Sequence, residues 1–388
     1  MNRISVIILI IIFLKSYMSL SQNIIPGADQ PDEYLGILEH KSIGLVINQT
    51  SLVANQNLVD FLFQKKIDIH TVFAPEHGFR GNVAPGEKIN DQVDEKTGIP
   101  VISLYGKNKK PSPEAMNDLD IIVFDIQDVG CRFYTYISTL HYVMEACAEN
   151  NKKLIILDRP NPNGDYVAGA IREPEFKSFV SLDPIPVVHG CTIGELALMI
   201  NGEGWLENHE KCDLEVIKVK NYTHSDRYSL PVQPSPNLPN DLSVRLYPSL
   251  CFFEATHVSI GRGTDFPFQA IGYPDATMGD FTFTPVDIPG VAVNPVQKNK
   301  CCYGNDLREE NENQKFTLKY FIDWYHKFKD EKDFISSERW LSLLSGSGEL
   351  LKMIRENKTE EEIPASWQTE LDQYKKIRKK YLLYPDSE

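Results

Sequence analysis

The sequence has little positive charge and lacks the short motifs of several enzyme classes. Its 40 Lys and Arg residues are outnumbered by 54 Asp and Glu residues, which gives a formal net charge of −14. Nucleic-acid binding needs a basic surface, so we expect no nucleic-acid partner. No Gly-x-Gly-x-x-Gly fingerprint, P-loop, Gly-x-Ser-x-Gly elbow, His-Glu-x-x-His or Cys-x-x-Cys pattern occurs. These absences argue against a standard dinucleotide enzyme, a P-loop NTPase, the usual serine hydrolases and the common zinc sites.

Long apolar runs are also missing beyond the N-terminus. There, Arg3 precedes an almost unbroken apolar run over residues 4–14, and Ser19-Leu20-Ser21 provides the small residues of a cleavage site. This pattern predicts a secretory signal peptide, residues 1–21, cut after Ser21; an uncleaved anchor is the alternative. The run is shorter than the about 20 apolar residues of a membrane-spanning helix. We therefore expect a secreted or periplasmic protein with no stable membrane insertion after cleavage.

The charge and size of the mature chain limit what it can bind and how it folds. Cleavage removes Arg3 and Lys15 and takes the net charge from −14 to −16, so an anionic ligand must be held by locally placed Arg or Lys residues. The remaining chain is longer than one hydrophobic core usually serves, which predicts two domains.

The seven cysteines show no metal-ligand spacing, and we expect most of them to be buried as small hydrophobic residues.

The first half alternates apolar strands with helices. Near-continuous apolar strands separated by helices predict a parallel sheet covered on both faces. A Pro-rich stretch at 231–239 indicates a domain boundary, which divides the chain into residues 22–238 and 239–388. The second part opens with short apolar stretches and ends in helices, typical of a smaller α+β domain. The expected strands lie at 42–50, 67–74, 101–105, 120–126, 153–157 and 213–220, and the expected helices at 56–65, 136–150, 192–205, 317–328, 338–344, 349–356 and 365–381.

Polar clusters follow three of the predicted strands. They are Pro75–Gly78, Gln127–Gly130 and Asp158–Asn161. In open parallel sheets the ligand lies beyond the carboxyl ends of the strands, so these clusters predict the site. Glu76 is the best candidate for a general acid or base, because apolar neighbours can raise the pKa of a carboxyl toward neutrality. His77 could orient Glu76 or bind substrate; alternatively, Glu76 only accepts backbone hydrogen bonds.

The segment from Asp125 to Tyr136 carries the residue types of a sugar site. Asp125 and Asp128 can accept hydroxyl hydrogen bonds, Tyr134 and Tyr136 can cover the apolar face of a ring, and Arg132 can pair with an acid group. The plainer alternative is that Asp128 caps the helix and the tyrosines belong to the core.

Two further turns are weaker candidates. In Asp158–Gly164, Asn161 or Asn163 could hydrogen-bond an acetamido group, although Asn, Pro and Gly also make plain turns. Arg262, between two glycines and backed by Thr264, could grip a carboxylate, although Gly-Arg-Gly is otherwise only a turn.

Taken together, the motifs resemble those of one family, the exo-β-N-acetylmuramidases, which was long catalogued as a domain of unknown function. The matching segments run in order over most of the mature chain. The resemblance implies a Rossmann-like N-terminal domain, a smaller C-terminal domain, and a cleft between them that releases N-acetylmuramic acid from the non-reducing ends of peptidoglycan fragments. The segments are 74–81, 125–136, 158–164, 235–237 and 259–264.

The resemblance also gives the candidate residues roles. Glu76 matches the glutamate expected to be the catalytic acid, and the second acidic group is expected to be Asp128, then Asp125, then Glu254. Arg132 or Arg262 would pair with the lactyl carboxylate of muramic acid. Retaining, inverting and acetamido-assisted routes all stay open, and no cofactor or metal is expected. The remaining expected substrate-binding residues are His77, Arg80, Gln127, Tyr134, Tyr136, Asp158, Asn161, Asn163, Asn237 and Thr264.

Two other functions fit the same residues. A metal-dependent hydrolase could use Glu76, His77, Asp128 and His189, although their spacing matches no known zinc motif. A non-catalytic wall-binding module would keep the aromatic and Arg residues and would not need Glu76.

Overall fold

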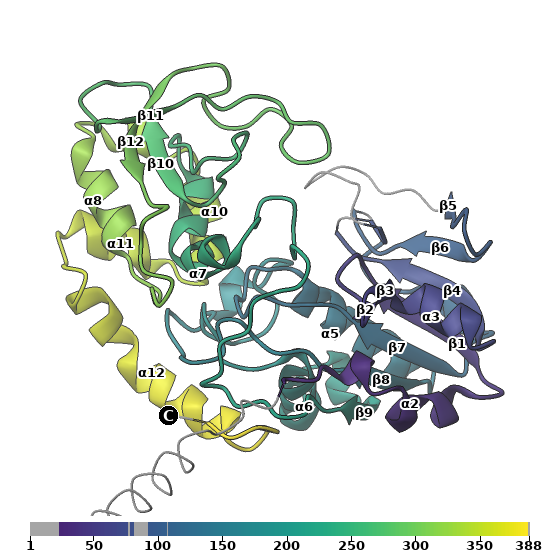
Figure 1. Ribbon diagram of the computed structural model, residues 1–388. Coiled ribbons are helices and arrows are strands. Elements are labelled where there is room, and N and C mark those ends of the chain that lie inside the picture. Colours follow the sequence, from purple (N-terminus) through teal and green to yellow (C-terminus); the bar gives the residue numbers. More distant parts are fainter. Residues whose placement is uncertain (1–22, 77, 81–91, 107, 387–388) are drawn as a thin grey trace, which may run out of the picture.

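The computed structural model describes residues 23–76, 78–80, 92–106 and 108–386. Its first half forms a seven-stranded sheet in the order β5-β6-β4-β1-β7-β8-β9 (Figure 1). Every neighbouring pair in this sheet is parallel except β5 and β6. The strands are β1 (Ser42–Ile47), β4 (Asp68–Ala74), β5 (Gln92–Val93), β6 (Pro100–Ser103), β7 (Ile121–Asp125), β8 (Lys153–Leu157) and β9 (Asp213–Ile217), with a small hairpin of β2 (Leu52–Val53) and β3 (Gln56–Asn57) after β1.

The sheet is apolar on both faces because helices cover both. On β8, Leu154 and Ile156 join one hydrophobic cluster, and Ile155 and Leu157 join the cluster on the other face. Gly44 of β1 leaves room on one face of the sheet for the side chains of Ile122 and Leu119, since a Cβ atom there would lie 2.7 and 2.9 Å from them. One face carries α5 (Tyr136–Glu149) and α6 (Ile193–Glu203), and the other carries α2 (Pro31–Leu38) and α3 (Leu58–Gln64); α4 (Pro113–Met116) is a short turn of helix before β7.

The strand order identifies the architecture. In chain order, the six parallel strands lie as 3-2-1-4-5-6, which is the order of the doubly wound Rossmann fold. The predicted fold class is therefore confirmed, with a large, mostly parallel sheet in the N-terminal part and a second domain after it. The crevice at the ends of β1 and β7, where such folds bind a dinucleotide, is filled by buried polar side chains: Thr50 Oγ1 donates to Asn48 Oδ1 at 2.6 Å and accepts from the backbone N–H of Gln127 at 3.0 Å.

The second domain contains a three-stranded antiparallel sheet, in the order β10-β12-β11, and a layer of helices. Figure 1 shows this domain standing above the carboxyl ends of the large sheet. The elements are α7 (Asp241–Leu250), a 3-10 helix (Cys251–Ala255), β10 (Ala270–Tyr273), β11 (Phe281–Phe283), β12 (Cys302–Asp306), α8 (Lys319–Lys327), α9 (Glu331–Phe334), α10 (Glu338–Ser345), α11 (Glu349–Arg355) and α12 (Glu362–Arg378).

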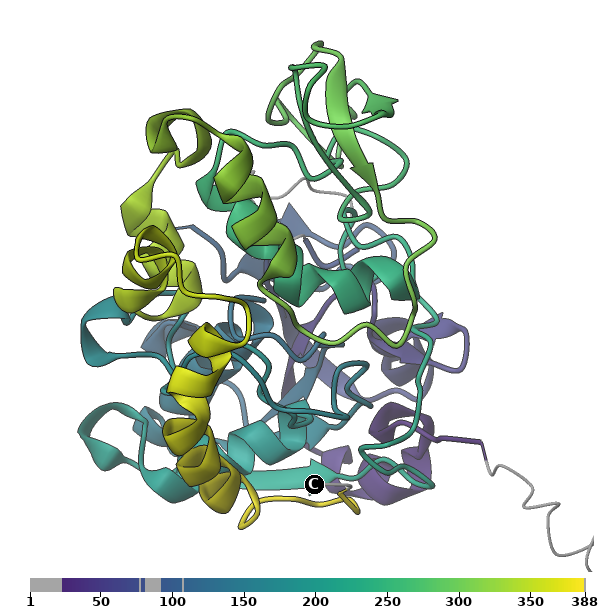
Figure 2. The ribbon, with the colours of Figure 1, turned by 90° about the vertical axis from the view of Figure 1, so that its left-hand side faces the viewer.

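One hydrophobic core joins the two domains. Phe133, in the segment between β7 and α5, packs edge-to-face on Tyr247 of α7 and on Phe252, with ring centroids 5.3 and 5.9 Å apart. α12 then runs back over the first domain (Figure 2), where Tyr374 donates its hydroxyl to the carbonyl of His189 at 2.8 Å. The domains are thus held by a shared core and by a returning helix.

Arg132 is a further bridge between the domains. Its guanidinium is fully buried and donates to the carbonyls of Ala170 and Ile185 in the first domain and of Leu344 in α10, at 2.6–3.0 Å. Burial, followed by the nearby Arg172, lowers the pKa of Arg132 to about 9. This geometry departs from the prediction that Arg132 binds a substrate carboxylate, because its donors face backbone carbonyls.

The sequence located most elements within a few residues, with a few exceptions. The elements that were not predicted are α2, the β2–β3 hairpin, β5, α4, α7, α9 and the three-stranded antiparallel sheet. Six cysteines are buried and Cys301 is exposed, all as free thiols, so the prediction of buried cysteines is confirmed. Within the described residues, no helix combines the length and the apolar character that crossing a membrane requires.

His141 of α5 gives the fold a testable pH dependence. Its two ring nitrogens contact Asp183 at 2.8 Å and Glu145 at 3.2 Å. Burial alone would lower the pKa of His141, but the two carboxylates outweigh burial and raise it to about 9. The folded pKa lies above the unfolded value of about 6.5, so this stabilisation is complete below about pH 6.5 and is lost as the pH rises through about 9.

We predict that His141→Gln lowers the melting temperature clearly at pH 6 and much less at pH 10. Thermal unfolding followed by circular dichroism across this range measures the difference. The exposed His326→Gln is the matched control and should leave the wild-type profile unchanged. An equal loss of stability for His141→Gln at both pH values would contradict the charged pairing.

Candidate active site

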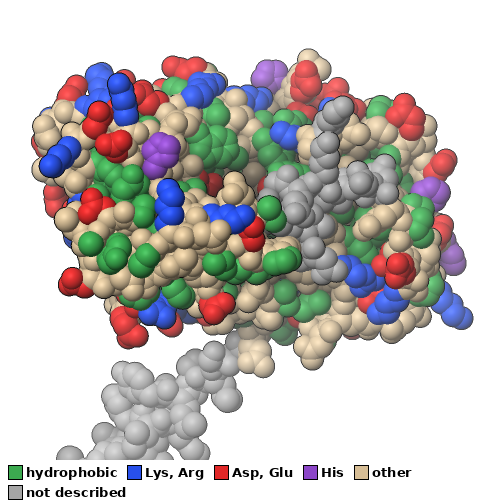
Figure 3. All heavy atoms as spheres, turned by 90° about the horizontal axis from the view of Figure 1, so that it is seen from above, with side chains coloured by type: hydrophobic (Ala, Val, Ile, Leu, Met, Phe, Trp, Pro, Cys, Tyr) green, Lys and Arg blue, Asp and Glu red, His purple; other side chains and the backbone are tan. Residues whose placement is uncertain are grey.

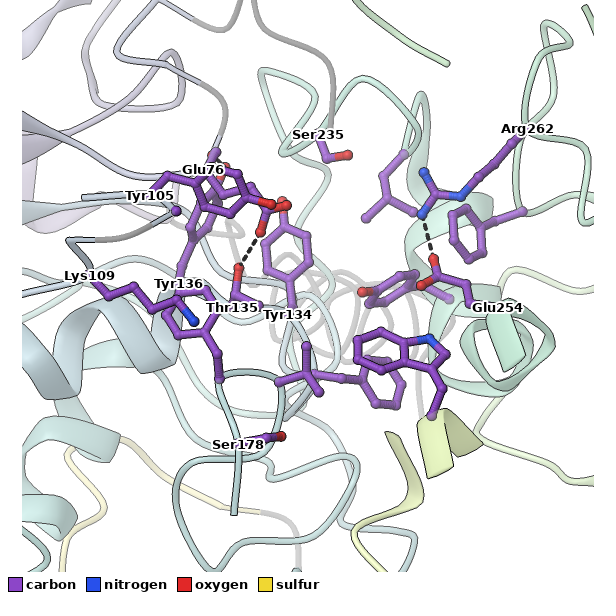
Figure 4. Close-up of a pocket in the computed structure, with 18 residues that line it drawn as sticks. Glu76, Tyr105, Lys109, Tyr134, Thr135, Tyr136, Ser178, Ser235, Glu254 and Arg262 are labelled. Carbon is purple, nitrogen blue, oxygen red and sulfur yellow. Dashed lines mark hydrogen bonds and ion pairs between the residues drawn. The ribbon is translucent and has the colours of Figure 1, made fainter. Parts of the chain in front are cut away.

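A cavity of about 510 Å³ lies between the carboxyl ends of β4, β6 and β7 and the second domain (Figure 4). This volume falls within the range of small-molecule sites. Seen from above, hydrophobic side chains gather around the hollow between the domains (Figure 3). The cavity is lined by Glu76, Tyr105, Gly106, Lys109, Phe133, Tyr134, Thr135, Tyr136, Ser178, Phe179, Val180, Ser235, Leu238, Tyr247, Glu254, Arg262, Phe268 and Trp340.

Glu76 stands at the end of β4 with its carboxylate in the cavity. Oε2 accepts a hydrogen bond from the hydroxyl of Thr135 at 2.8 Å, and the backbone carbonyl of Glu76 accepts one from the hydroxyl of Tyr136 at 3.2 Å. The phenol of Tyr105 lies beside the same carboxylate (Figure 4), and burial together with Glu76 raises the pKa of Tyr105 to about 12. Tyr105 therefore stays protonated at neutral pH and faces Glu76 as a donor.

Thr135 is available to Glu76 because it does not cap the helix that follows. Thr135 precedes the first residue of α5, but its side chain makes no capping hydrogen bond. Its backbone carbonyl accepts from the N–H groups of Ser138 and Thr139 at 3.0 Å, which fixes the residue at the helix entrance. The hydroxyl is left to hold the carboxyl group of the candidate acid.

Tyr134 and Tyr136 form the floor beside Glu76. Their rings meet edge-to-face with centroids 4.9 Å apart, and the hydroxyl of Tyr134 donates to the carbonyl of Pro234 at 2.7 Å. Burial raises the pKa of both phenols above the ordinary value. Both side chains therefore present a rigid, uncharged aromatic surface, as expected for residues that line a sugar pocket.

The opposite wall comes from the second domain. Figure 4 shows Glu254 and Arg262 facing the cavity across from Glu76, joined by an ion pair. The Arg262 guanidinium also lies 5.0 Å from the ring centroid of Phe268. Tyr247 of α7 and Trp340 of α10 complete this aromatic wall.

The Gly-Arg-Gly turn that carries Arg262 requires its glycines. Gly261 and Gly263 have φ values of 78° and 82°, in the left-handed region. A Cβ atom would lie 2.7 Å from the carbonyl oxygen of Phe266 at Gly261 and 2.5 Å from that of Val286 at Gly263. Thr264 closes the turn by donating to the carbonyl of Gly261 at 2.6 Å, so it supports Arg262 and does not line the cavity.

Asp125 and Asp128 do not line the cavity. Asp125 is fully buried and forms a paired contact with Arg159, at 2.5 and 2.9 Å; burial raises its pKa, and Arg159 opposes that rise. Asp128 accepts from the backbone N–H of Gly130 at 2.6 Å, and Nε2 of His189 lies 3.5 Å away. The structure places both carboxylates in the protein interior, so the geometry favours Glu254 over either of them as the second acidic group.

The other strand-end residues also form internal cross-links. Asp158 accepts from Thr192, from the N–H of Gly194 and from Tyr384, and burial raises its pKa to about 6. The remaining contacts are Gln127 to the carbonyls of Asp128 and Pro160, Asn161 to the carbonyl of Cys191, and Asn163 to the carbonyls of Val129 and Val244. None of these four lines the cavity, and their hydrogen bonds join the ends of β7 and β8 to neighbouring loops.

Two further expected binding residues lie elsewhere. Arg80 pairs with Asp94 at 2.9 and 3.0 Å, and Asn237 donates to the carbonyl of Val291 at 2.8 Å. Neither lines the cavity. His77 lies outside the described residues.

Sequence reasoning missed Thr135, Tyr105, Lys109 and Trp340. Thr135 lies inside the Asp125–Tyr136 segment, and its place directly before the helix was the one signal that could have marked it. Tyr105 ends a predicted strand, which is the position where the other candidates were found. Lys109 and Trp340 carry no local signal. Lys109 lies in a loop of the first domain whose side-chain direction the sequence does not give, and Trp340 joins the site only when the second domain packs on the first.

The described residues do not bring the proposed metal ligands together. Glu76 bonds to Thr135, whereas Asp128 and His189 contact each other behind the cavity. Among the described side chains, the one trio of acidic or histidine groups close enough to share an ion is Glu145, Glu149 and Glu207, outside the cavity. The ammonium of Lys110 already contacts Glu145 and Glu149.

Two family models match the chain in succession. The model described as exo-β-N-acetylmuramidase NamZ, N-terminal, matches residues 43–242, and the corresponding C-terminal model matches residues 245–384. The chain belongs to the exo-β-N-acetylmuramidase NamZ family. The two models meet within α7, at the start of the second domain.

Known proteins agree with this assignment. The chain is 39% identical over 373 residues to a Bacillus subtilis (strain 168) protein named peptidoglycan β-N-acetylmuramidase NamZ, covering 91% of this chain and 89% of that protein. Two crystal structures of DUF1343 family proteins from Bacteroides fragilis NCTC 9343 have the same fold. One has a TM-score of 0.88 at 46% identity and covers 94% of this chain and 100% of its own; the other has a TM-score of 0.80 at 30% identity and covers 93% and 99%.

The hydrogen bond from Thr135 to Glu76 predicts a role for the Thr135 hydroxyl in orienting this candidate acid. Thr135→Val keeps the side-chain shape and removes the donor. We expect kcat on a muramic acid glycoside to fall about tenfold or more, since small misplacements of a catalytic group are costly, while KM and the melting temperature stay close to wild type. Thr135→Ser should keep most of the activity. Equal kcat values for the Val and Ser variants would rule out this role.

Proposed function

We propose that this protein is an exo-acting β-N-acetylmuramidase that releases N-acetylmuramic acid from the non-reducing ends of peptidoglycan fragments. Family membership supports a glycoside hydrolase of this kind, as does the similarity to a relative named for that activity. The observation that carries the proposal is the position of Glu76. Its carboxylate lies in an aromatic-lined cavity, held by Thr135, with the Glu254–Arg262 pair on the facing wall.

Glu76 acts as the general acid in this proposal. It gives a proton to the glycosidic oxygen, the bond from that oxygen to C1 breaks, and the rest of the fragment leaves as an alcohol. Water supplies the hydroxyl group at C1 of the released sugar. Hydrogen bonding of Oε2 by Thr135 fixes the orientation of the carboxyl group toward the cavity, so that its proton faces the bound sugar.

Glu254 is the second carboxylate in this proposal. Glu76 and Glu254 are the two acidic residues that line the described cavity. Its ion pair with Arg262 holds Glu254 on the wall that faces Glu76, where a carboxylate can stabilise a positively charged, oxocarbenium-like transition state. Aromatic side chains line the cavity, and a sugar bound against them would displace water and so strengthen these charge interactions.

Two substrates that differ in their leaving group distinguish the role of Glu76 from that of Glu254. Glu76→Gln should lower kcat/KM by about 10²–10⁴-fold on a muramic acid–glucosamine disaccharide, whose leaving group needs a proton. The same variant should keep much of its activity on an aryl β-glycoside of N-acetylmuramic acid with an acidic phenol, which leaves without one. Glu254→Gln should lose activity on both substrates, because stabilisation of the transition state is needed in each case.

Asp128→Asn is the matched control, since Asp128 lies near the same strand ends but outside the cavity; we expect it to cleave both substrates while it stays folded. Full disaccharide activity of Glu76→Gln would exclude Glu76 as the acid. A wild-type protein that binds muramic acid fragments without cleaving either substrate would favour a non-catalytic binding module.

The site of action is proposed to be outside the cytoplasm. The basis is the apolar run after Arg3 and the cleavage pattern that ends at Ser21, together with a substrate that forms part of the cell wall. Expression of the full chain in a bacterium, fractionation and N-terminal sequencing test this. We expect protein that begins at Gln22 in the periplasm or medium; uncut protein in the cytoplasm would refute it.

A further inference from the structure

The described cavity contains two cationic side chains, Lys109 and Arg262, in very different settings. Arg262 is already paired with Glu254 and packs on Phe268. A substrate carboxylate placed on Arg262 would also meet the negative charge of Glu254, which weakens the attraction. A neutral, polar group such as a sugar hydroxyl suits this pair better, because it can donate to Glu254 and accept from Arg262.

Lys109 offers a cation without an acidic partner. Its ammonium lies 4.1 Å from the ring centroid of Phe179, and no carboxylate among the described residues pairs with it. Figure 4 shows Lys109 on the same side of the cavity as Glu76, with its side chain reaching inward. Lys109 is partly buried, so its charge is screened less than on an open surface, and an incoming anion would be attracted more strongly.

Neighbouring contacts hold this ammonium in place. The next residue, Lys110, turns outward and contacts Glu149 at 2.6 Å and Glu145 at 3.4 Å, which tethers the loop to α5. The carbonyl of Phe179 accepts from the hydroxyl of Ser138 at 2.7 Å, and the Phe179 ring stacks on Tyr142. Both the loop that carries Lys109 and the ring beneath it are therefore anchored on α5.

We propose that Lys109 binds the lactyl carboxylate of N-acetylmuramic acid and thereby selects this sugar over uncharged N-acetylhexosamines. The inference rests on the proposed function and deepens it. The lactyl carboxylate is the group that muramic acid adds to glucosamine, and a chain with a net charge of −14 needs a local cation to hold it. Lys109 takes the role that the sequence suggested for Arg132 or Arg262. The Glu254–Arg262 pair then binds hydroxyl groups of the sugar ring.

Two aryl β-glycosides test the proposal: that of N-acetylmuramic acid, and the same compound with its lactyl carboxylate converted to the amide. Lys109→Met should lower kcat/KM on the acid about 10- to 100-fold, mainly through KM, as the loss of a charge-assisted hydrogen bond implies. Its kcat/KM on the amide should stay within about twofold of wild type. The preference of the wild type for the acid over the amide should therefore disappear.

Lys65→Met is the matched control, since Lys65 also lies over a phenylalanine ring, 5.6 Å from the centroid of Phe61, but outside the cavity; it should keep the wild-type preference. Lys109→Arg should also keep most of it. A Lys109→Met protein that retains the wild-type preference overturns the assignment of Lys109 while leaving the glycosidase proposal intact. A wild type that cleaves neither glycoside overturns the proposed function and this inference with it.

Discussion

The packing of Phe133 against Tyr247 and Phe252 is the contact on which the site depends. A doubly wound sheet provides loops at its carboxyl ends but leaves the space beyond them open. Here that space is closed by a second domain whose core is continuous with that of the first. Glu76 and Glu254 come from opposite sides of this junction, so the cavity between them exists only while the aromatic contact holds.

Buried polar groups secure the same junction. Among the described residues Arg132 has no acidic partner, and its two terminal nitrogens donate to backbone carbonyls from both domains. Asp158 receives the hydroxyl of Tyr384, from the segment after α12, as well as that of Thr192 at the start of α6. A buried donor or acceptor without a partner is costly. These side chains therefore specify one arrangement of the two domains. Their polar groups bind other parts of the protein and not a ligand.

The first domain was more predictable from sequence than the second. The strands β1, β4, β7 and β8 are buried on both faces, and buried parallel strands read as continuous apolar runs, so each was located within a few residues. The strands β10, β11 and β12 have at most five residues each, and their Gly- and Pro-rich surroundings hide the alternation that marks a strand. The helix α7 begins at a capping Asn240 and contains Pro248, which breaks the usual helical pattern.

The site was only partly predictable, for a physical reason. Sequence order showed that polar residues follow the strands, and Glu76, Tyr134, Tyr136, Glu254 and Arg262 do line the cavity. It did not show which way each side chain points. Asp125, Asp128 and Asn163 lie in equivalent strand-end positions, but their side chains turn inward. Asp125 accepts from Arg159, Asp128 accepts from the backbone N–H of Gly130, and Asn163 donates to the carbonyl of Val129. Trp340 enters the site through the packing of the second domain on the first, and Lys109 enters it through the course of the loop after β6; no local pattern encodes either.

The most direct test of the account is a crystal structure of the Glu76→Gln variant with an intact muramic acid–glucosamine disaccharide. The account predicts that the muramic acid ring lies between the two domains. The side chain of residue 76 should be within hydrogen-bond distance of the glycosidic oxygen, and Glu254 should contact the same ring. A disaccharide bound outside this cavity, or one whose glycosidic oxygen lies beside another carboxylate, would contradict it.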